Sequence, residues 1–286
     1  MKNIIFSTTT ALIITLFTSC KNDVVVTPAR TDIHLDSNAQ VGSHLVDKDG
    51  KTLYYFSNDA NGLSNCTGGC LTAWPIYRAD SATTTIGAGL SASDFSTITT
   101  AAGAKQTTYK GWPLYYYSPG GTQEAAGQTT GEGVGGIWFV AKPNYSIMIA
   151  NHQLTGINGI NYLGTYAPGD GRTIYLTDAK GNTLYAFGKD SALINKFTAA
   201  DFSNNASWPI YETDQVVVPT ILDKSAFVAM TFNGKKQLTY KGWPLYYFGP
   251  DNSVRGANKG ITIPPSKPVG SVWPIVKPDA APAPTR

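Results

Sequence analysis

Apolar and polar residues alternate over short stretches of this chain, and turn residues bound each stretch. Residues 53–56 read Leu-Tyr-Tyr-Phe and follow an Asp-Gly pair at 49–50. Asp-Gly favours a tight hairpin turn because glycine tolerates a positive φ without steric cost. In the strand that follows, Leu53 and Tyr55 point to one face and Tyr54 and Phe56 to the other, so both faces are apolar or aromatic. The pattern predicts short strands packed on both faces.

The same pattern recurs along the chain. The segment Lys-Gly-Trp-Pro-Leu-Tyr-Tyr at 110–116 returns unchanged at 241–247. A shorter Leu-Tyr-x-aromatic unit occurs at 53–56, 114–117, 184–187 and 245–248. The six tryptophans form three pairs with similar sequence offsets of 131, 134 and 135 residues, which favours a structural role for them. We therefore predict an all-β fold of two homologous halves, each built from two related β-hairpin units in a sandwich- or barrel-like arrangement.

The repeats and the composition along the chain set the expected boundaries. These are a signal peptide at 1–19, a lipid-anchored tether at 20–40, the first repeat half at 41–143, a connector at 144–169, the second repeat half at 170–278, and a disordered tail at 279–286.

The overall composition agrees with an exported all-β protein. Charged residues make up 14% of the 286 residues and aromatic residues 12%, while glycine and proline are frequent. The formal net charge is only +3, and the charges are scattered. This balance does not indicate a nucleic acid partner.

The N-terminus predicts export. Lys2 precedes an apolar run from Ile4 to Phe17, which is too short and too polar to span a bilayer and is typical of a signal peptide. Thr18 and Ser19 stand directly before Cys20, and this order resembles the lipobox of bacterial lipoproteins. The resemblance implies cleavage before Cys20 and acylation of that residue, which would hold the protein on a membrane by lipid chains. The alternative is an ordinary signal peptide whose removal discards Cys20.

Three copies of one motif point to a known family. Tyr-x-Phe-x-x-Asp occurs at 54–59, 185–190 and 246–251. With the Gly-Trp-Pro-Leu-Tyr-Tyr segments and Cys-Thr-Gly-Gly-Cys, it resembles the bacterial lipoprotein family called the secreted repeat of unknown function. The resemblance implies secretion and a repeated structure, and it implies no established activity. The unit that contains Tyr115 departs from the motif, because Gly120 stands where the aspartate would be.

The motif aspartates are the first candidate site residues. Asp59, Asp190 and Asp251 stand at strand ends, where aspartate commonly caps a turn through its side chain. The competing interpretation makes them ligands of a shared cation. His34, His44 and His152 lack the spacing of metal ligands, and we expect no metal site and no cofactor.

Cys66 and Cys70 are the remaining cysteines after Cys20. In an exported protein the pair is expected to form a disulfide, because the two glycines between them permit a tight turn. At the corresponding positions the second half has Ala200 and Asn204, so both cysteines are absent together. The alternative is a redox or metal-handling role.

The repeated tyrosines are the other candidates. Tyr55, Tyr116 and Tyr247 would form a platform for a glycan or a small hydrophobic ligand if they faced outward, and would belong to the core if they did not.

No nucleophile–base pair and no facing pair of acids can be assigned, so the sequence does not predict an enzyme. We expect a non-catalytic binding or structural module, lipid-anchored in the cell envelope at the outer membrane. The alternatives are a glycan- or hydrophobe-binding protein and a redox or metal-handling accessory protein of the envelope.

Overall fold

The computed structural model describes residues 31–79 and 84–285. The signal peptide and Cys20 lie outside this part of the chain. The first half contains β1 (Ile33–Asn38), β2 (Gly42–Asp47), β3 (Tyr54–Phe56), β4 (Phe95–Thr99), β5 (Lys105–Tyr109), β6 (Trp112–Tyr115) and β7 (Trp138–Val140). The second contains β8 (Met148–Thr155), β9 (Asn161–Tyr162), β10 (Arg172–Thr177), β11 (Tyr185–Ala186), β12 (Phe227–Phe232), β13 (Lys235–Tyr240) and β14 (Trp243–Tyr246).

Within residues 31–79 and 84–285, helical structure is limited to single turns. The α-helix α1 covers Cys70–Ala73, and the 3₁₀ helices are η1 (Ser57–Asp59), η2 (Ala92–Asp94), η3 (Pro119–Gly121), η4 (Val134–Gly136), η5 (Lys224–Ala226), η6 (Gly249–Asp251) and η7 (Lys259–Thr262). In the described ranges no helix has the length and apolar character needed to cross a bilayer. The predicted all-β fold is confirmed.

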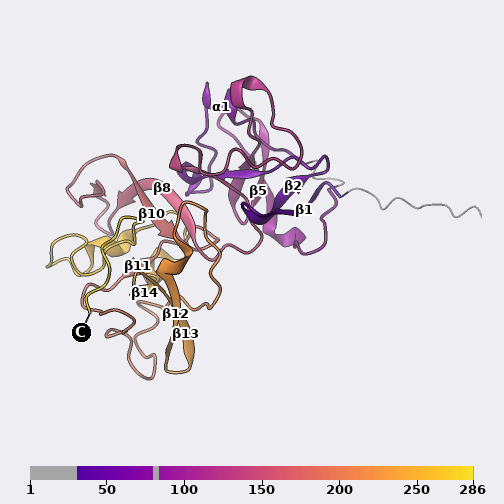
Figure 1. The fold of residues 1–286 in the computed structure, drawn as a ribbon. Helices are drawn as coiled ribbons and strands as arrows, with labels where there is room; N and C mark the ends of the chain where they lie inside the picture. The colour runs from indigo at the N-terminus through magenta and orange to yellow at the C-terminus, as the bar shows by residue number, and fades with distance from the viewer. Residues whose placement is uncertain (1–30, 80–83, 286) are drawn as a thin grey trace, which may run out of the picture. The chain divides into compact units, whose positions relative to one another are not determined.

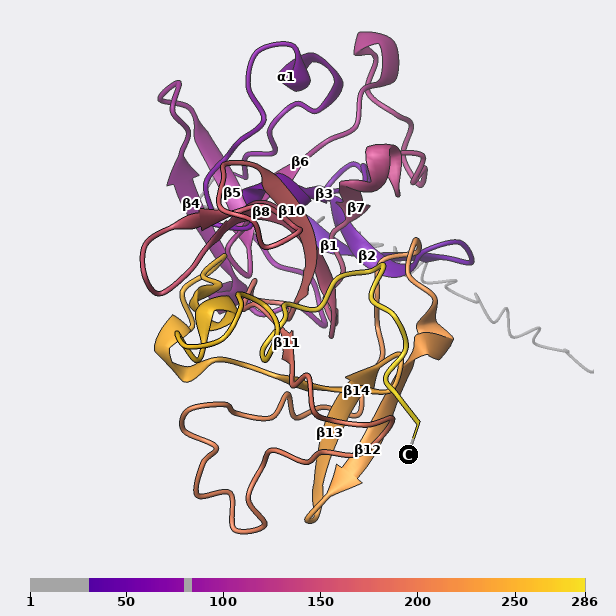
Figure 2. The same cartoon turned by 90° about the vertical axis from the view of Figure 1, so that its left-hand side faces the viewer.

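The two halves contain the same antiparallel sheet. Its order is β4-β5-β6-β3-β7 in the first half and β12-β13-β14-β11 in the second. An isolated bridge between Tyr185 and Ile275 takes the place of the β3–β7 pairing. The hairpin of β12 and β13 is seen beside β14 in Figure 2. The predicted duplication is therefore present in the strand order as well as in the sequence.

The repeated Lys-Gly pair forms the turn between two of these strands. Tyr109 pairs with Trp112, so Lys110 and Gly111 form a two-residue hairpin loop. Their φ angles are 48° and 80°, and positive φ at both positions is the type I′ geometry that matches the twist of a hairpin. Lys241 and Gly242 repeat it, with φ of 48° and 84°.

The structure differs from the expected boundaries of the tether and the connector. Residues 33–38, placed in the tether, form β1, and Ile33 is fully buried. Residues 148–155, placed in the connector, form β8, which lies beside β10 (Figure 1). β1 pairs with β2 as β8 pairs with β10, so each half begins with an equivalent strand pair. These strands share no sequence motif, and what the two halves have in common here is the antiparallel pairing.

The hairpin expected at the Asp-Gly turn is also shorter than its sequence suggests. A single bridge joins Val46 to Thr52, and β3 then pairs with β6 and β7 instead of β2. The reason is the two-sided apolar character of β3, which fits a central position between two strands.

The C-terminal tail, expected to be disordered, is packed against the second half. Ala283 is buried, and its N–H donates to the carbonyl of Lys241 at 2.9 Å. The Trp243 indole donates to the carbonyl of Ala281 at 2.9 Å. The proline- and alanine-rich composition predicts disorder for this segment. The tail is ordered because the second half binds its main-chain groups, and this binding does not require large side chains.

The core confirms the two-sided packing of β3. Tyr54 and Phe56 pack with Trp74 and Trp138 on one face. Tyr55 faces the other way, into the cluster that also contains Leu184 and most of the second-half core. The halves therefore share a hydrophobic core. Each half contains a stacked pair of tryptophan rings. The ring centroids of Trp74 and Trp138 lie 3.8 Å apart, and those of Trp208 and Trp273 lie 3.6 Å apart, as a structural role for these residues predicts.

Candidate functional site

The motif aspartates are buried, with exposed fractions of 0%, 1% and 6% for Asp59, Asp190 and Asp251. Each accepts a hydrogen bond from a tyrosine of the neighbouring unit: Tyr115 to Asp59 at 2.6 Å, Tyr246 to Asp190 at 2.8 Å, and Tyr185 to Asp251 at 2.6 Å. The motif tyrosine and aspartate of one unit therefore bind residues of the other unit, not each other.

The second oxygen of each carboxylate binds a loop. The donors are backbone N–H groups: Asn65 to Asp59 at 2.7 Å, Lys196 to Asp190 at 2.7 Å, and Lys259 to Asp251 at 2.9 Å. Each carboxylate thus joins a strand tyrosine of one unit to a loop that follows the other. We call this three-part arrangement a clasp. It agrees with the turn-capping interpretation of the aspartates and occupies both carboxylate oxygens.

Glu124 completes a fourth clasp that the motif did not reveal. Tyr54 donates to Glu124 Oε1 at 2.6 Å, and the backbone N–H of Thr130 donates to Oε2 at 3.0 Å. Gly120, at the motif position, adopts a φ of 65° instead. Glu124 is the first acidic residue after Tyr115, which is the signal that could have identified it.

Burial governs the ionisation of the three motif aspartates. It raises the pKa of Asp59 to about 7 and that of Asp190 to about 6, and it raises the pKa of Asp251. The hydrogen bonds from tyrosine and backbone N–H groups lower these pKa values, and desolvation is the larger effect. The tyrosine pKa values rise as well, chiefly through burial.

The three candidate tyrosines have different surroundings. Tyr55 is fully buried against Trp112, with ring centroids 5.0 Å apart, so it is not an exposed platform. Tyr116 and Tyr247 are half-buried, and their hydroxyls donate to Asp47 at 2.7 Å and to Asp178 at 3.0 Å.

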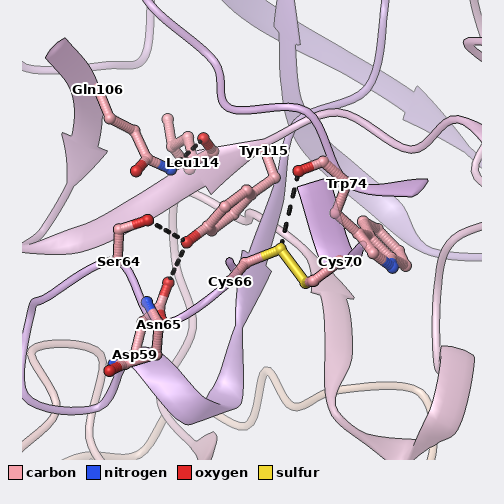
Figure 3. The surroundings of a disulfide bond; sticks show 9 residues. All are labelled: Asp59, Ser64, Asn65, Cys66, Cys70, Trp74, Gln106, Leu114 and Tyr115. Atoms are coloured by element: carbon pink, nitrogen blue, oxygen red, sulfur yellow. Dashed lines mark hydrogen bonds between the residues drawn. A yellow bond between two sulfur atoms is a disulfide. The ribbon is translucent and has the colours of Figure 1, made fainter. Parts of the chain in front are cut away.

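Cys66 and Cys70 form the predicted disulfide, with their Cα atoms 5.4 Å apart (Figure 3). The N–H of Asn65, the residue before Cys66, is the loop donor to Asp59. The disulfide loop therefore adjoins a clasp.

Asn204 takes the position of Cys70 in the second half. The N–H of Trp208 donates to the Asn204 carbonyl, as the N–H of Trp74 donates to the Cys70 carbonyl. The Asn204 side chain binds the N–H of Ala199 at 2.9 Å and the carbonyl of Phe197 at 2.8 Å. Side-chain hydrogen bonds restrain this loop where the first half has a disulfide.

An open cleft of about 880 Å³ lies between the two halves. Its first-half wall includes Ser93, Asp94, Ser96, Lys110 and Gly111. Its second-half wall includes Asp178, Asn182, Thr183, Tyr211, Tyr247, Phe248, Asp251 and Arg255. Of the candidate residues, Tyr247 and Asp251 border the cleft, whereas Tyr55, Tyr116, Asp59 and Asp190 do not.

Arg255 joins the two halves at the edge of this cleft. Its Nη1 donates to the carbonyl of Lys110 at 2.8 Å and also to the carbonyl of Lys180. Its guanidinium lies 4.5 Å from the centre of the Trp112 ring. Burial lowers the pKa of Arg255 to about 10. No sequence motif identified this residue, because its partners are main-chain carbonyls from distant turns.

The cleft offers hydroxyl, amide and carbonyl groups beside aromatic rings. Asp178 and Asp251 both accept hydrogen bonds from tyrosines, which limits them as acids or bases toward a ligand. Within residues 31–79 and 84–285, no group of three or more His, Cys, Asp or Glu side chains is placed to hold a metal ion. The arrangement is suited to binding a polar molecule through hydrogen bonds and ring contacts.

Comparison with known proteins identifies the repeats of the first half. Residues 37–77 and 96–142 match the profile of a family described as a secreted repeat of unknown function. The resemblance inferred from the motifs is confirmed for these two segments, and the family description is that of a secreted protein. Each matched segment supplies one tyrosine and one carboxylate to the reciprocal clasps of the first half. No curated protein and no solved structure matches the chain.

Proposed function

We propose that this secreted-repeat protein is a non-catalytic binding module of the cell envelope, and that the cleft between its halves binds a glycan. The observation that carries the proposal is the cleft of about 880 Å³, which is large enough for a small oligosaccharide and has an aromatic and polar lining.

The lining has the groups that a sugar requires. Tyr247, which is half-buried, supplies aromatic surface for the C–H face of a pyranose ring, and the buried rings of Tyr211 and Phe248 border the cleft beside it. Ser93, Ser96 and Asn182 supply donors and acceptors for its hydroxyls. A purely hydrophobic ligand would leave these polar groups without partners, and this cost favours the glycan over the hydrophobic alternative.

Two neighbouring residues of β4 provide a matched test. Ser96 is exposed and borders the cleft, whereas Thr97 is exposed and does not border it. Ser96→Trp should obstruct the cleft and weaken glycan binding at least tenfold, and Thr97→Trp should bind as the wild type does. The measurement is a glycan array followed by calorimetry on the best sugar.

Equal binding by both tryptophan variants would refute the cleft as the site. Failure of the folded wild-type protein to bind any sugar at millimolar concentration would refute the glycan assignment.

Anchoring is the second part of the proposal. The lipobox-like order before Cys20 supports acylation of that cysteine and retention at the outer membrane. Cys20→Ser should release the protein from the membrane fraction into the soluble one. Fractionation with Cys66→Ser as a control for cysteine loss tests this, and membrane retention of the Cys20 variant would refute the anchor.

A further inference from the structure

The Lys-Gly hairpins carry equivalent binding groups in the two halves. We use the word socket for the tyrosine hydroxyl, lysine ammonium, lysine carbonyl and tryptophan indole around each turn. The first socket consists of Tyr109, Lys110 and Trp112, and the second of Tyr240, Lys241 and Trp243.

The first socket holds segments on both sides of the junction between the halves. Tyr109 and Lys110 donate to the carbonyl of Pro143 at 3.3 and 2.7 Å. The Trp112 indole donates to the carbonyl of Ala179 at 3.2 Å. The Lys110 carbonyl accepts from Arg255. The first socket is therefore occupied by Pro143 at the end of the first half and by Ala179 and Arg255 of the second half.

The second socket holds the C-terminal segment in the same way. Tyr240 and Lys241 donate to the carbonyl of Pro278 at 2.8 and 2.9 Å. The Trp243 indole donates to the carbonyl of Ala281, and the Lys241 carbonyl accepts from the N–H of Ala283 at 2.9 Å.

Beyond the shared Lys-Pro dipeptide at 142–143 and 277–278, the two occupants are unrelated in sequence. One is a hairpin turn with an arginine, and the other is an extended segment rich in alanine and proline. The socket therefore recognises mainly backbone carbonyls. Proline suits such a segment because it lacks an N–H that would need a partner and favours an extended backbone.

The side chains that the tail packs against the second half are small: Ala280 is half-buried against the core, and the carbonyl of Pro284 accepts from the N–H of Ala192 at 2.9 Å. Ala283 is buried, and its Cβ lies 3.3 Å from the position that a Cβ on Gly242 would take. Asp279, Ala281, Pro282, Pro284 and Thr285 are exposed. Trp243 itself remains partly exposed, whereas Trp112 is 2% exposed in the first socket. A segment that buries so little apolar surface is easily displaced.

We propose that the second socket is a peptide-binding site for an extended alanine- and proline-rich segment, occupied here by the chain's own tail and open to the tail of a second copy. We assign the tail of a second copy as the occupant because this tail supplies the same carbonyls and the same small residue that the socket already holds. Exchange of tails would join copies without any new contact.

A full-length variant with a displaced tail tests the site. Ala283→Asp places a charge in the buried position against Gly242 and should release the tail. A labelled peptide with the sequence of residues 278–286 should then bind this variant at least tenfold more tightly than the wild type, whose own tail competes. Ala281→Asp is the matched control, because the side chain of Ala281 is exposed and only its carbonyl is bound. That variant should bind like the wild type.

Two full-length variants test whether the tail of one copy occupies the second socket of another copy. Ala283→Asp has an intact socket without its tail, and Trp243→Ala has an intact tail without its socket. Each should be monomeric alone, and their mixture should form a heterodimer by analytical ultracentrifugation. Lys241→Ala, which loses the bonds to Pro278 and Ala280, replaces Trp243→Ala if that variant does not fold.

A folded Ala283→Asp chain that fails to bind the peptide would overturn the site. A full-length chain cut at a protease sequence inserted between Lys277 and Pro278 provides a check without a tail substitution, and failure of the labelled peptide to replace the cut tail would also overturn it. Peptide binding without heterodimer formation would overturn the assignment to a second copy.

Discussion

At the scale of single residues, the repeated Tyr-x-Phe-x-x-Asp motif is explained by a reciprocal exchange. Tyr54 and Tyr115 are opposite each other on β3 and β6, and each donates to the carboxylate that follows the other strand. Tyr185 and Tyr246 repeat the arrangement on β11 and β14. A buried carboxylate is stable only with hydrogen-bond partners, so a tyrosine in each unit requires an acid in the other.

Removing a clasp hydroxyl should destabilise the fold. Tyr115→Phe and Tyr246→Phe each leave a buried carboxylate oxygen without its tyrosine donor, and the expected loss is about 1–3 kcal/mol in the free energy of unfolding. Tyr117→Phe is the control, because Phe248 stands at the equivalent position of the second half. Its expected change is below about 0.5 kcal/mol. Urea denaturation measures all three, and equal stability of the Tyr115 and Tyr117 variants would contradict the clasp.

Stability should depend on pH through Asp59. Its pKa is about 7 in the folded protein, mainly because of burial, and an unfolded aspartate titrates near 4. The folded state thus binds the proton more tightly. Protonation of Asp59 therefore stabilises the folded state. Its contribution to the free energy of unfolding is complete below about pH 4 and is lost as the pH rises through about 7, a total change of at most about 4 kcal/mol.

Asp59→Asn should flatten the fall in unfolding free energy between about pH 4 and 7 relative to the wild type. Asp36→Asn, which changes an exposed aspartate, should retain the wild-type slope. Denaturant titrations at several pH values test this, and parallel curves for wild type and Asp59→Asn would exclude the assignment.

At the scale of elements, local signals predicted the structure well and distant pairings did not. The Lys-Gly turns follow from positive φ at adjacent residues, a property that a short sequence carries by itself. β1 and β8 depend on partners supplied by β2 and β10, and their own sequences have little apolar alternation. Glu124 was missed for a related reason, since a loop of different length brings its carboxylate to the position of the motif aspartate.

The disulfide loop should be replaceable by the hydrogen bonds of the second half. A loop this short restrains little chain entropy, so Cys66→Ala with Cys70→Ala should lose at most about 2 kcal/mol. Cys66→Ala with Cys70→Asn should recover part of that loss, because Asn204 holds the equivalent loop through its side chain. Thermal unfolding compares the two double variants. Identical midpoints would show that asparagine does not substitute for the disulfide.

At the scale of the whole molecule, the halves are joined by a shared core and by Arg255. Tyr55 and Trp112 of the first half belong to the same apolar cluster as Leu184 of the second. Across the junction, Arg255 adds a hydrogen bond to the carbonyl of Lys110 and a cation–π contact with Trp112, and within the second half it binds the carbonyl of Lys180. A Cβ atom on Gly111 or on Gly181 would lie within 3.0 Å of the Arg255 guanidinium. Glycine at both positions therefore leaves room for this side chain. The junction thus depends on glycines that also form turns.

Arg255→Ala should therefore weaken the coupling between the halves. The carbonyls of Lys110 and Lys180 lose a donor and Trp112 loses a cation, and the expected cost is about 2–4 kcal/mol. Arg255→Lys should recover only part of this, because an ammonium lacks the planar fork that stacks on the indole while binding two carbonyls. Arg172→Ala removes an exposed arginine and should change stability by less than about 0.5 kcal/mol.

In calorimetry, we expect one transition for the Arg172 variant and separate transitions of the two halves for the Arg255→Ala variant. A single transition at the wild-type midpoint in Arg255→Ala would mean that the shared core alone couples the halves.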